Sequence, residues 1–259
     1  MRVLFVGDVI GRPGRTAVKL LLPSLVHDHG IDLTIANGEN AAGGIGITPE
    51  VAKELLSSGV DVITTGNHVW HKKEIYSFID QEERLLRPAN YPPGNPSKEF
   101  LVREVKGHAV AVVNLCGRVF MPHLDCPFRC MDRLLKDLES ITNLIIVDFH
   151  GEATSEKYAI AWYLDGRVSA VVGTHTHVPT ADERILPGGT AYITDAGMVG
   201  STDSVIGVKK EEIIERFLTQ RPISFSVAKG HRRLDAVVID IDEKDGRATS
   251  IQRINLDVD

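Results

Sequence analysis

Residues 33–68 read LTIANGENAAGGIGITPEVAKELLSSGVDVITTGNH, and this stretch decides the fold class. Two short apolar runs, 33–37 and 60–64, flank a segment 49–58 in which leucine and alanine recur at helical spacing. Thr48 followed by Pro49 is typical of a helix N-cap and its first helical position. A strand, a helix and a second strand in this order predict a βαβ unit within a parallel sheet.

The rest of the chain extends this pattern on both sides. Upstream, residues 3–7 predict a first strand and residues 15–29 a helix. Downstream, residues 91–96 read YPPGNP and form a loop, because prolines neither continue a helix nor fill a central strand. Beyond the loop we predict a hairpin of strands 100–105 and 109–115 around Lys106-Gly107, a helix over 131–140, and strands over 144–149, 168–172, 191–194 and 236–241. These elements predict an α/β chain with helices outside a mixed sheet system, in one domain over residues 1–259.

Composition narrows the class of protein. Of the 259 residues, 43 % are apolar and 25 % are charged, as in soluble globular enzymes rather than disordered or membrane proteins. The net charge of -6 gives no basic field for duplex nucleic acid, although cations inside a cleft still permit a small anionic substrate. No apolar run approaches the ~20 residues of a membrane span. Three cysteines make no disulfide framework, and we therefore predict a cytoplasmic protein without a membrane partner.

Side chains of metal-binding types follow five of the predicted strands. In chain order they are Asp8; Glu39 and Asn40; Asn67 and His68; His150; and His175 and His177. The carboxyl ends of parallel strands meet at one edge of an α/β sheet, so these side chains are expected to converge in one cleft. Each residue alone has an ordinary structural interpretation, as a helix cap, a turn or a core histidine. Five such coincidences at five strand ends favour a functional site.

The donor set favours transition metals. Carboxylate and amide oxygens with three imidazoles, and without thiolate, suit Mn, Fe or Zn better than Ca. In Gly173-Thr174-His175-Thr176-His177 one residue separates the two histidines, and we expect them to serve two different metals lying side by side. Glu39, with two oxygens, is the expected bridge. Two metals ~3.5–4 Å apart lower the pKa of a bridging water and neutralise charge on a phosphoryl group, which predicts a phosphoesterase.

The ordered motifs of residues 7–177 resemble those of the calcineurin-type metallophosphoesterase superfamily. They are Gly7-Asp8, Gly38-Glu39-Asn40, Gly66-Asn67-His68, His150 and Gly173-Thr174-His175-Thr176-His177. The superfamily usually has Asp-x-His in the first block and Gly-Asp in the second, whereas this chain has Ile10 and Glu39. With these departures and the run GENAAGG at 38–44, the chain is similar to the branch of YmdB-like phosphodiesterases.

This resemblance implies a four-layer α/β/β/α sandwich and hydrolysis of cyclic nucleotides, 2′,3′-cyclic and also 3′,5′-cyclic. It implies two divalent or trivalent transition metal ions, Fe or Mn with Zn or Mg as alternatives. Asp8, Glu39 and His177 would hold the first metal, and the second would be held by Glu39, Asn67, His150 and His175. Asn40 would bind a metal or contact the phosphate. Ile10 replaces an imidazole, so the first metal is expected to be the more labile.

His68 carries the catalytic prediction, because it lies one residue beyond Asn67 and has no metal to bind. It would act as a general acid at the leaving-group oxygen, a role that contributes ~10²–10⁴-fold. The alternative is that His68 only orders its loop through a hydrogen bond.

Two other functions stay open from the sequence. A phosphomonoesterase would use the same metals, and a regulatory protein would use the site to hold a nucleotide or an RNA end. A homo-oligomer is also left open.

Two other groups of residues do not form recognised sites. The glycines at 7, 11 and 14 do not have dinucleotide-binding spacing. Cys116, His123, Cys126 and Cys130 lack the usual spacing of zinc ligands, so we interpret these thiols as buried or half-exposed.

Overall fold

The computed structural model describes residues 1–258, so Asp259, the last residue of the predicted domain, lies outside the described part. The helices are α1 Gly11–His29, α2 Pro49–Ser57, α3 Ile75–Phe78, α4 Pro127–Leu138, α5 Thr154–Leu164 and α6 Lys210–Thr219. The strands are β1 Arg2–Val6, β2 Asp8–Val9, β3 Leu33–Asn37, β4 Val62–Thr64, β5 Phe100–Val105, β6 His108–Cys116, β7 Ile145–His150, β8 Ala170–Thr174, β9 Arg184–Ile185, β10 Ala191–Ile193, β11 Met198–Ser201, β12 Arg232–Ile241 and β13 Ala248–Val258.

The strands form two mixed sheets. The first has the order β2-β11-β12-β1-β3-β4 with β13 paired to β12, and the second has the order β5-β6-β7-β8-β10-β9. Strands β1, β3 and β4 run parallel, so the βαβ unit predicted for residues 33–68 is confirmed. Strands β6, β7, β8 and β10 are the parallel part of the second sheet. The predicted hairpin is the antiparallel pair of β5 and β6.

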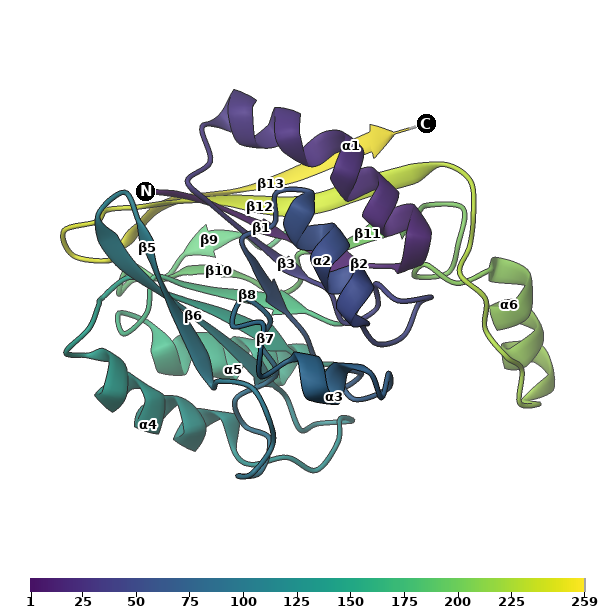
Figure 1. Cartoon of the computed structure of the whole chain (residues 1–259), viewed down its shortest axis with the longest axis horizontal. Helices are drawn as coiled ribbons and strands as arrows, with labels where there is room; N and C mark the ends of the chain where they lie inside the picture. Colours follow the sequence, from purple (N-terminus) through teal and green to yellow (C-terminus); the bar gives the residue numbers. More distant parts are fainter. Residues whose placement is uncertain (259) are drawn as a thin grey trace.

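Three buried cores separate four layers of helices and sheets, and Figure 1 shows the order of these layers. Alternate residues of β1 point to opposite faces of its sheet. Leu4 therefore packs with Leu22 of α1 on the outer face, while Phe5 packs with Val112 of the second sheet. Helices α4 and α5 cover the far face of the second sheet in a third core. The fold is the four-layer α/β/β/α sandwich that the sequence resemblance implied.

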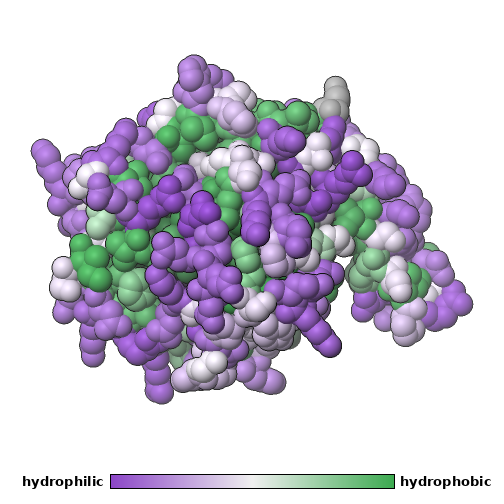
Figure 2. Space-filling view, viewed as in Figure 1, coloured by the Kyte–Doolittle hydropathy of each residue, from purple (hydrophilic) through white to green (hydrophobic). Residues whose placement is uncertain are grey.

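Some elements escape prediction from hydrophobic periodicity. Helix α5 is one, because its buried face carries Glu156 and Lys157 among apolar residues. Helix α6 is another, since Ile213 is its one buried residue. This helix projects from the body in Figure 1, and apolar side chains gather over it in Figure 2. The short strand β11 and the long strand β13 were not predicted either. None of the helices within residues 1–258 is long and apolar enough to cross a membrane.

Candidate metal centre

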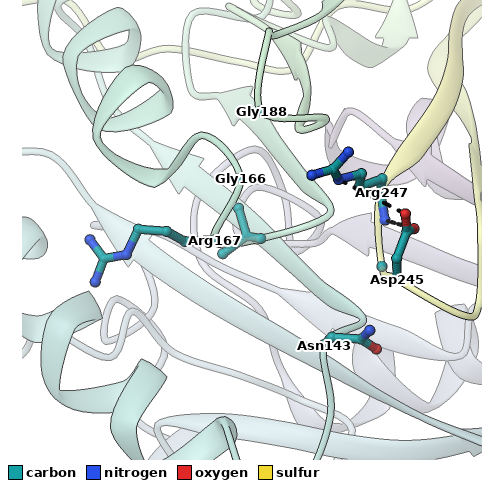
Figure 3. Close-up of a pocket in the computed structure, with 8 residues that line it drawn as sticks. Asn143, Gly166, Arg167, Gly188, Asp245 and Arg247 are labelled. Carbon is teal, nitrogen blue, oxygen red and sulfur yellow. Dashed lines mark hydrogen bonds and ion pairs between the residues drawn. The ribbon is translucent and has the colours of Figure 1, made fainter.

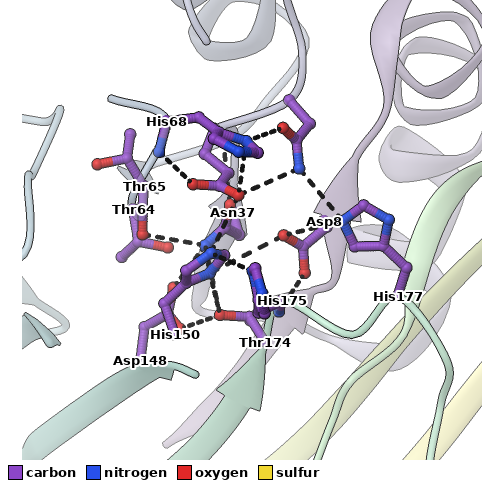
Figure 4. A network of polar contacts seen from close by, with 12 residues as sticks. Asp8, Asn37, Thr64, Thr65, His68, Asp148, His150, Thr174, His175 and His177 are labelled. Atoms are coloured by element: carbon purple, nitrogen blue, oxygen red, sulfur yellow. Dashed lines mark hydrogen bonds and ion pairs between the residues drawn. The ribbon is translucent and has the colours of Figure 1, made fainter. Parts of the chain in front are cut away.

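The predicted polar side chains meet where the carboxyl ends of the parallel strands of both sheets face one another (Figure 4). Asp8 lies in β2 directly after β1, and Glu39 and Asn40 follow β3. His150 is the last residue of β7 rather than the first residue after it. Strand β8 ends at Thr174, one residue before His175. Residues from both sheets meet in one cluster because the parallel strands of the two sheets end on the same side of the molecule.

One group of side chains is centred on Glu39 and His150. Glu39 Oε1 lies 3.0 Å from His150 Nε2, and His175 Nδ1 lies 3.0 Å from the same nitrogen. Asn67 Oδ1 is 3.2 Å from it. Glu39, His150 and His175 offer ligand atoms within 4.8 Å of one another, an arrangement that could hold a metal ion. These are the residues predicted for the second metal.

A second group lies beside the first. His177 Nε2 is 3.7 Å from Asp8 Oδ1 and 3.2 Å from Asn40 Nδ2. Asn40 Nδ2 also donates to Glu39 Oε1 at 3.2 Å. Glu39 therefore touches both groups, as expected of a bridge. The two histidines of the His-x-His motif join different groups, His175 beside His150 and His177 beside Asp8.

The backbone around these residues is unusual in two ways. His175 has a φ of 100° and His177 a φ of 63°, values that L-residues rarely adopt. Such conformations persist where surrounding contacts over-determine them, and they gather at functional sites. At Gly66, an added Cβ would collide with the imidazole of His150 and with Glu39 Oε2. Only glycine lets the Gly-Asn-His loop approach the cluster so closely.

Buried charges shift one another's ionisation. Burial would lower the pKa of His150, but the carboxylate of Glu39 raises it to about 9. Burial alone would raise the pKa of Glu39, yet the charge on His150 holds it well below its usual range. Burial, helped by His150, lowers the pKa of His175 to about 3. Because a ligating imidazole must be neutral, a cation bound here would take the place of the His150 proton.

The environment of Asp8 tests whether these residues fit metal ions. Asp8 is fully buried, and its Oδ1 has no hydrogen-bond donor among the described residues 1–258. Burial raises the pKa of Asp8 to about 6, although His177 and His150 oppose the shift. A buried carboxylate oxygen without a donor is costly unless it is paired or coordinates a cation. Together with oxygen and imidazole donors around it, this oxygen fits a metal ligand.

His68 lies at the open side of the cluster. Its backbone N–H donates to Glu39 Oε2 at 3.1 Å, and its Nδ1–H donates to Asn40 Oδ1 at 2.8 Å. The second bond fixes the ring and leaves Nε2 as the nitrogen available to a substrate. It also occupies the oxygen through which Asn40 would bind a metal. Burial lowers the pKa of His68, although Glu39 opposes this shift.

Sequence reasoning missed the residues that hold His150. Its Nδ1 lies 2.9 Å from Thr174 Oγ1, which in turn donates to Asp148 Oδ1 at 2.6 Å. Asn37 Nδ2 donates to Asp148 Oδ2 at 3.0 Å, and all four side chains are buried (Figure 4). Such outer partners fix the tautomer and direction of a metal-binding imidazole. The available signal was Asp148 itself, a charge inside the apolar run of β7.

The position predicted to lack an imidazole is filled by apolar packing. Ile10 is 2 % exposed. It lies against Gly207, where an added Cβ would come within 2.8 Å of Ile10 Cγ2. Ile10 is therefore packed in the interior and supplies no metal-binding atom at this position.

The cluster opens into a cleft of about 810 Å³ lined by Glu39, Asn40, His68, His175 and His177, among others. A second cavity of about 420 Å³, drawn in Figure 3, is lined by Asn143, Arg167 and Arg247. It contains none of the predicted site residues, and Arg167 is paired with Asp132.

The cysteines and His123 are not part of any group of side chains within residues 1–258 that could hold a metal ion. Cys116 and Cys130 are buried and Cys126 is half-buried, as interpreted from the sequence.

Comparisons with known proteins agree with this geometry. Residues 4–254 match the family described as YmdB-like protein. The chain is 52 % identical over 259 residues to the 2′,3′-cyclic-nucleotide 2′-phosphodiesterase of Bacillus subtilis strain 168, covering 100 % of this chain and 98 % of that one. A crystal structure of a hypothetical protein from Thermus thermophilus superposes with a TM-score of 0.93 at 48 % identity, covering 99 % of both chains. That of a novel phosphatase from Mycoplasma pneumoniae has a TM-score of 0.94 at 36 % identity, covering 99 % of this chain and 93 % of that one.

Proposed function

The chain belongs to the YmdB-like family and is an enzyme of the phosphodiesterase class, and from that premise we propose that it is a metal-dependent hydrolase of 2′,3′-cyclic nucleotides. The observation that carries the metal dependence is the buried, donor-free oxygen of Asp8 beside two groups that share Glu39. A relative of 52 % identity named for the 2′,3′-cyclic reaction supports the substrate class. The 3′,5′-cyclic diesters are a second substrate of the same proposal.

We assign the metal ligands according to the two groups of side chains described above. Asp8, Glu39 and His177 would hold one ion, and Glu39, Asn67, His150 and His175 would hold the other. When bound, two such ions lower the pKa of a water and neutralise the charge that develops on the phosphate. Fe and Mn are the ions that this mixture of oxygen and imidazole donors favours, with Zn and Mg as alternatives. Ile10 supplies no imidazole, so the ion held by Asp8, Glu39 and His177 would be bound more weakly than the other.

The chain's own residues would then position the ester and move the proton. His68 lines the cleft and its Nδ1–H is held by Asn40, so when the ring carries its second proton, Nε2–H would give that proton to the departing ribose oxygen. Asn40 would thus orient the ring of His68 and would also lie next to the phosphate. Because the relative is named a 2′-phosphodiesterase, the expected product is a nucleoside 3′-phosphate.

The decisive experiment is hydrolysis of 2′,3′-cyclic AMP and bis(p-nitrophenyl) phosphate. Protein stripped with chelator is assayed before and after addition of Mn²⁺ or Fe²⁺, with metal analysis of the same samples. We expect turnover that disappears with the metal and returns with about two ions per chain. Full activity in protein shown to contain no metal would overturn the metal dependence.

A phosphomonoesterase is the second candidate function, supported by the Mycoplasma pneumoniae structure that is described as a phosphatase. The same donor set would serve both esters, since both place charge on the same oxygens. Comparing p-nitrophenyl phosphate with the bis-ester separates them, and we expect the diester to be preferred. A purely regulatory nucleotide-binding role would instead show binding without turnover. For each of these functions we propose a cytoplasmic location, as the cysteine content predicts.

A further inference from the structure

The cleft beside the candidate metal centre has one apolar wall, which we call the α6 wall. Its members are Val205, Ile206, Val208, Arg216, Phe217 and Phe225, all of which line the same 810 Å³ cleft as Glu39 and His177. The same cleft is also lined by residues of metal-binding types, which are Glu39, Asn40, His68, His175 and His177. An occupant of the whole cleft therefore needs one anionic end and one flat apolar end.

The α6 wall is attached to the metal-type cluster at a defined point. His177 Nδ1 donates to the backbone oxygen of Ile206 at 2.9 Å. The two segments of the wall are tied together by Lys209 N to Ser226 O at 3.0 Å and by Ala228 N to Gly207 O at 2.9 Å. Ser226 N also donates to Glu212 Oε2 of α6 at 2.6 Å. The wall is thus fixed relative to the site rather than hanging free.

Its aromatic side chains are exposed, although they lie in a lined cleft. Phe217 is 71 % and Phe225 is 44 % exposed, and no other ring stacks on either within residues 1–258. The guanidinium of Arg216 lies over Phe225, with Cζ 4.9 Å from the ring centroid. A ring next to a guanidinium plane is the arrangement on which nucleobases stack, because every base has an apolar π-face.

We propose that the α6 wall is the nucleobase subsite of this enzyme, with Phe225 and Arg216 stacking the base while the phosphate lies at the Glu39 and His177 side. This inference rests on the proposed function and adds to it that the substrate class is base-bearing rather than any small phosphodiester. The wall then determines which substrates bind and takes no part in bond breaking. Substitutions in it should therefore change KM rather than kcat.

The test compares Phe225→Ala with the wild type on two cyclic diesters that share the five-membered ring. One is 2′,3′-cyclic AMP and the other is glycerol 1,2-cyclic phosphate, which has no base. We expect KM for cyclic AMP to rise about tenfold, equal to ~1.4 kcal/mol, with kcat nearly unchanged. The base-free ester should change less than about twofold. Phe225→Trp should restore the wild-type KM, and Leu218→Ala, 80 % exposed and outside the cleft, is the matched control.

A binding measurement gives a readout that does not depend on turnover. Calorimetry should show about tenfold weaker binding of adenosine 3′-monophosphate to Phe225→Ala, with binding of inorganic phosphate unchanged. If the wild type cleaves both diesters and the variant loses activity on both equally, the subsite is wrong while the proposed function stands. If the wild type cleaves neither, the proposed function itself fails. A variant that changes only the subunit number in sedimentation would make the wall a protein interface and overturn the subsite.

Discussion

The ammonium group of Lys157 lies 2.7 Å from Asp195 Oδ2 in the interior, where both side chains are buried. The same carboxylate oxygen accepts from the backbone N–H of Thr176 at 3.0 Å and from its hydroxyl at 2.7 Å. Thr176 stands between His175 and His177, and the backbone N–H of His175 donates to Asp8 at 3.1 Å. The buried ion pair therefore fixes the segment that carries both histidines in their rare backbone conformation.

Replacing Lys157 by Met is expected to weaken metal binding about 10–100-fold, the usual cost of losing an outer partner of a metal ligand. The same change leaves the Asp195 carboxylate buried without its cation, so the free energy of unfolding should fall by ~3–5 kcal/mol. Chelator competition and urea denaturation measure the two effects.

Two further variants isolate the cause. Lys157→Met combined with Asp195→Asn removes the buried charge, so it should be more stable than Lys157→Met alone. Lys210→Met breaks the ion pair with Asp203, whose partners are both exposed, and should change stability little. A double variant no more stable than the single one would mean that packing, not charge, explains the loss.

The sequence predicted the βαβ core well because its strands are apolar runs and its helix α2 has a proper cap, with Thr48 Oγ1 accepting from Val51 N at 3.4 Å. It failed for α5, where Lys157 and Glu156 replace apolar residues on the buried face to serve contacts far away in the chain. It also failed for α6, whose apolar residues face a cleft and solvent rather than a core. Hydrophobic periodicity reports the burial of apolar side chains, whereas α5 buries two charged residues and α6 buries only Ile213.

The sequence predicted the residues of the candidate site but not the residues that hold them in position. The predicted side chains lie in or next to one cluster, because strand ends converge in this fold. Asn37 and Thr174 were missed since each looks like an ordinary strand residue, and the charge of Asp148 inside an apolar run was not used. Their role depends on pairings between β3, β7 and β8 that no local pattern reveals. Metal ligation by the predicted residues stays a prediction.

Thiol reactivity tests the packing of the cysteines. Burial raises the pKa of Cys130 to about 11, so at pH 8 only roughly 0.1 % of it is thiolate, the reactive form. Burial also raises the pKa of Cys116 well above its usual value. We expect one rapidly reacting thiol in the native protein at pH 8, removed by Cys126→Ser, and three after unfolding. The Cys130 rate should rise about tenfold per pH unit up to about pH 10. Three equally fast native thiols would contradict this packing.

Glu39→Gln tests the shared ligand. The amide keeps the shape of the side chain but removes the charge next to both metal-type groups, so metal content and diester turnover should fall together. A loss of more than about 100-fold in kcat/KM is expected, because losing an outer partner alone costs ~10–100-fold. Glu50→Gln, on the exposed first turn of α2, is the matched control and should retain both metals. A Glu39→Gln protein with full metal content and full turnover would rule out the bridge.

His68→Ala separates general acid catalysis from loop ordering, since the imidazole of His68 faces the cleft and binds no metal in the assignment. Turnover of 2′,3′-cyclic AMP should fall ~10²–10⁴-fold with unchanged metal content, because the ribose oxygen leaves poorly without a proton. The loss on bis(p-nitrophenyl) phosphate should be much smaller, as nitrophenolate leaves without protonation. His71→Ala removes a neighbouring exposed ring, 4.9 Å from that of His68, and should leave both activities near the wild type. Equal losses of His68→Ala on the two esters would assign His68 to ordering the loop, because a structural defect does not distinguish leaving groups.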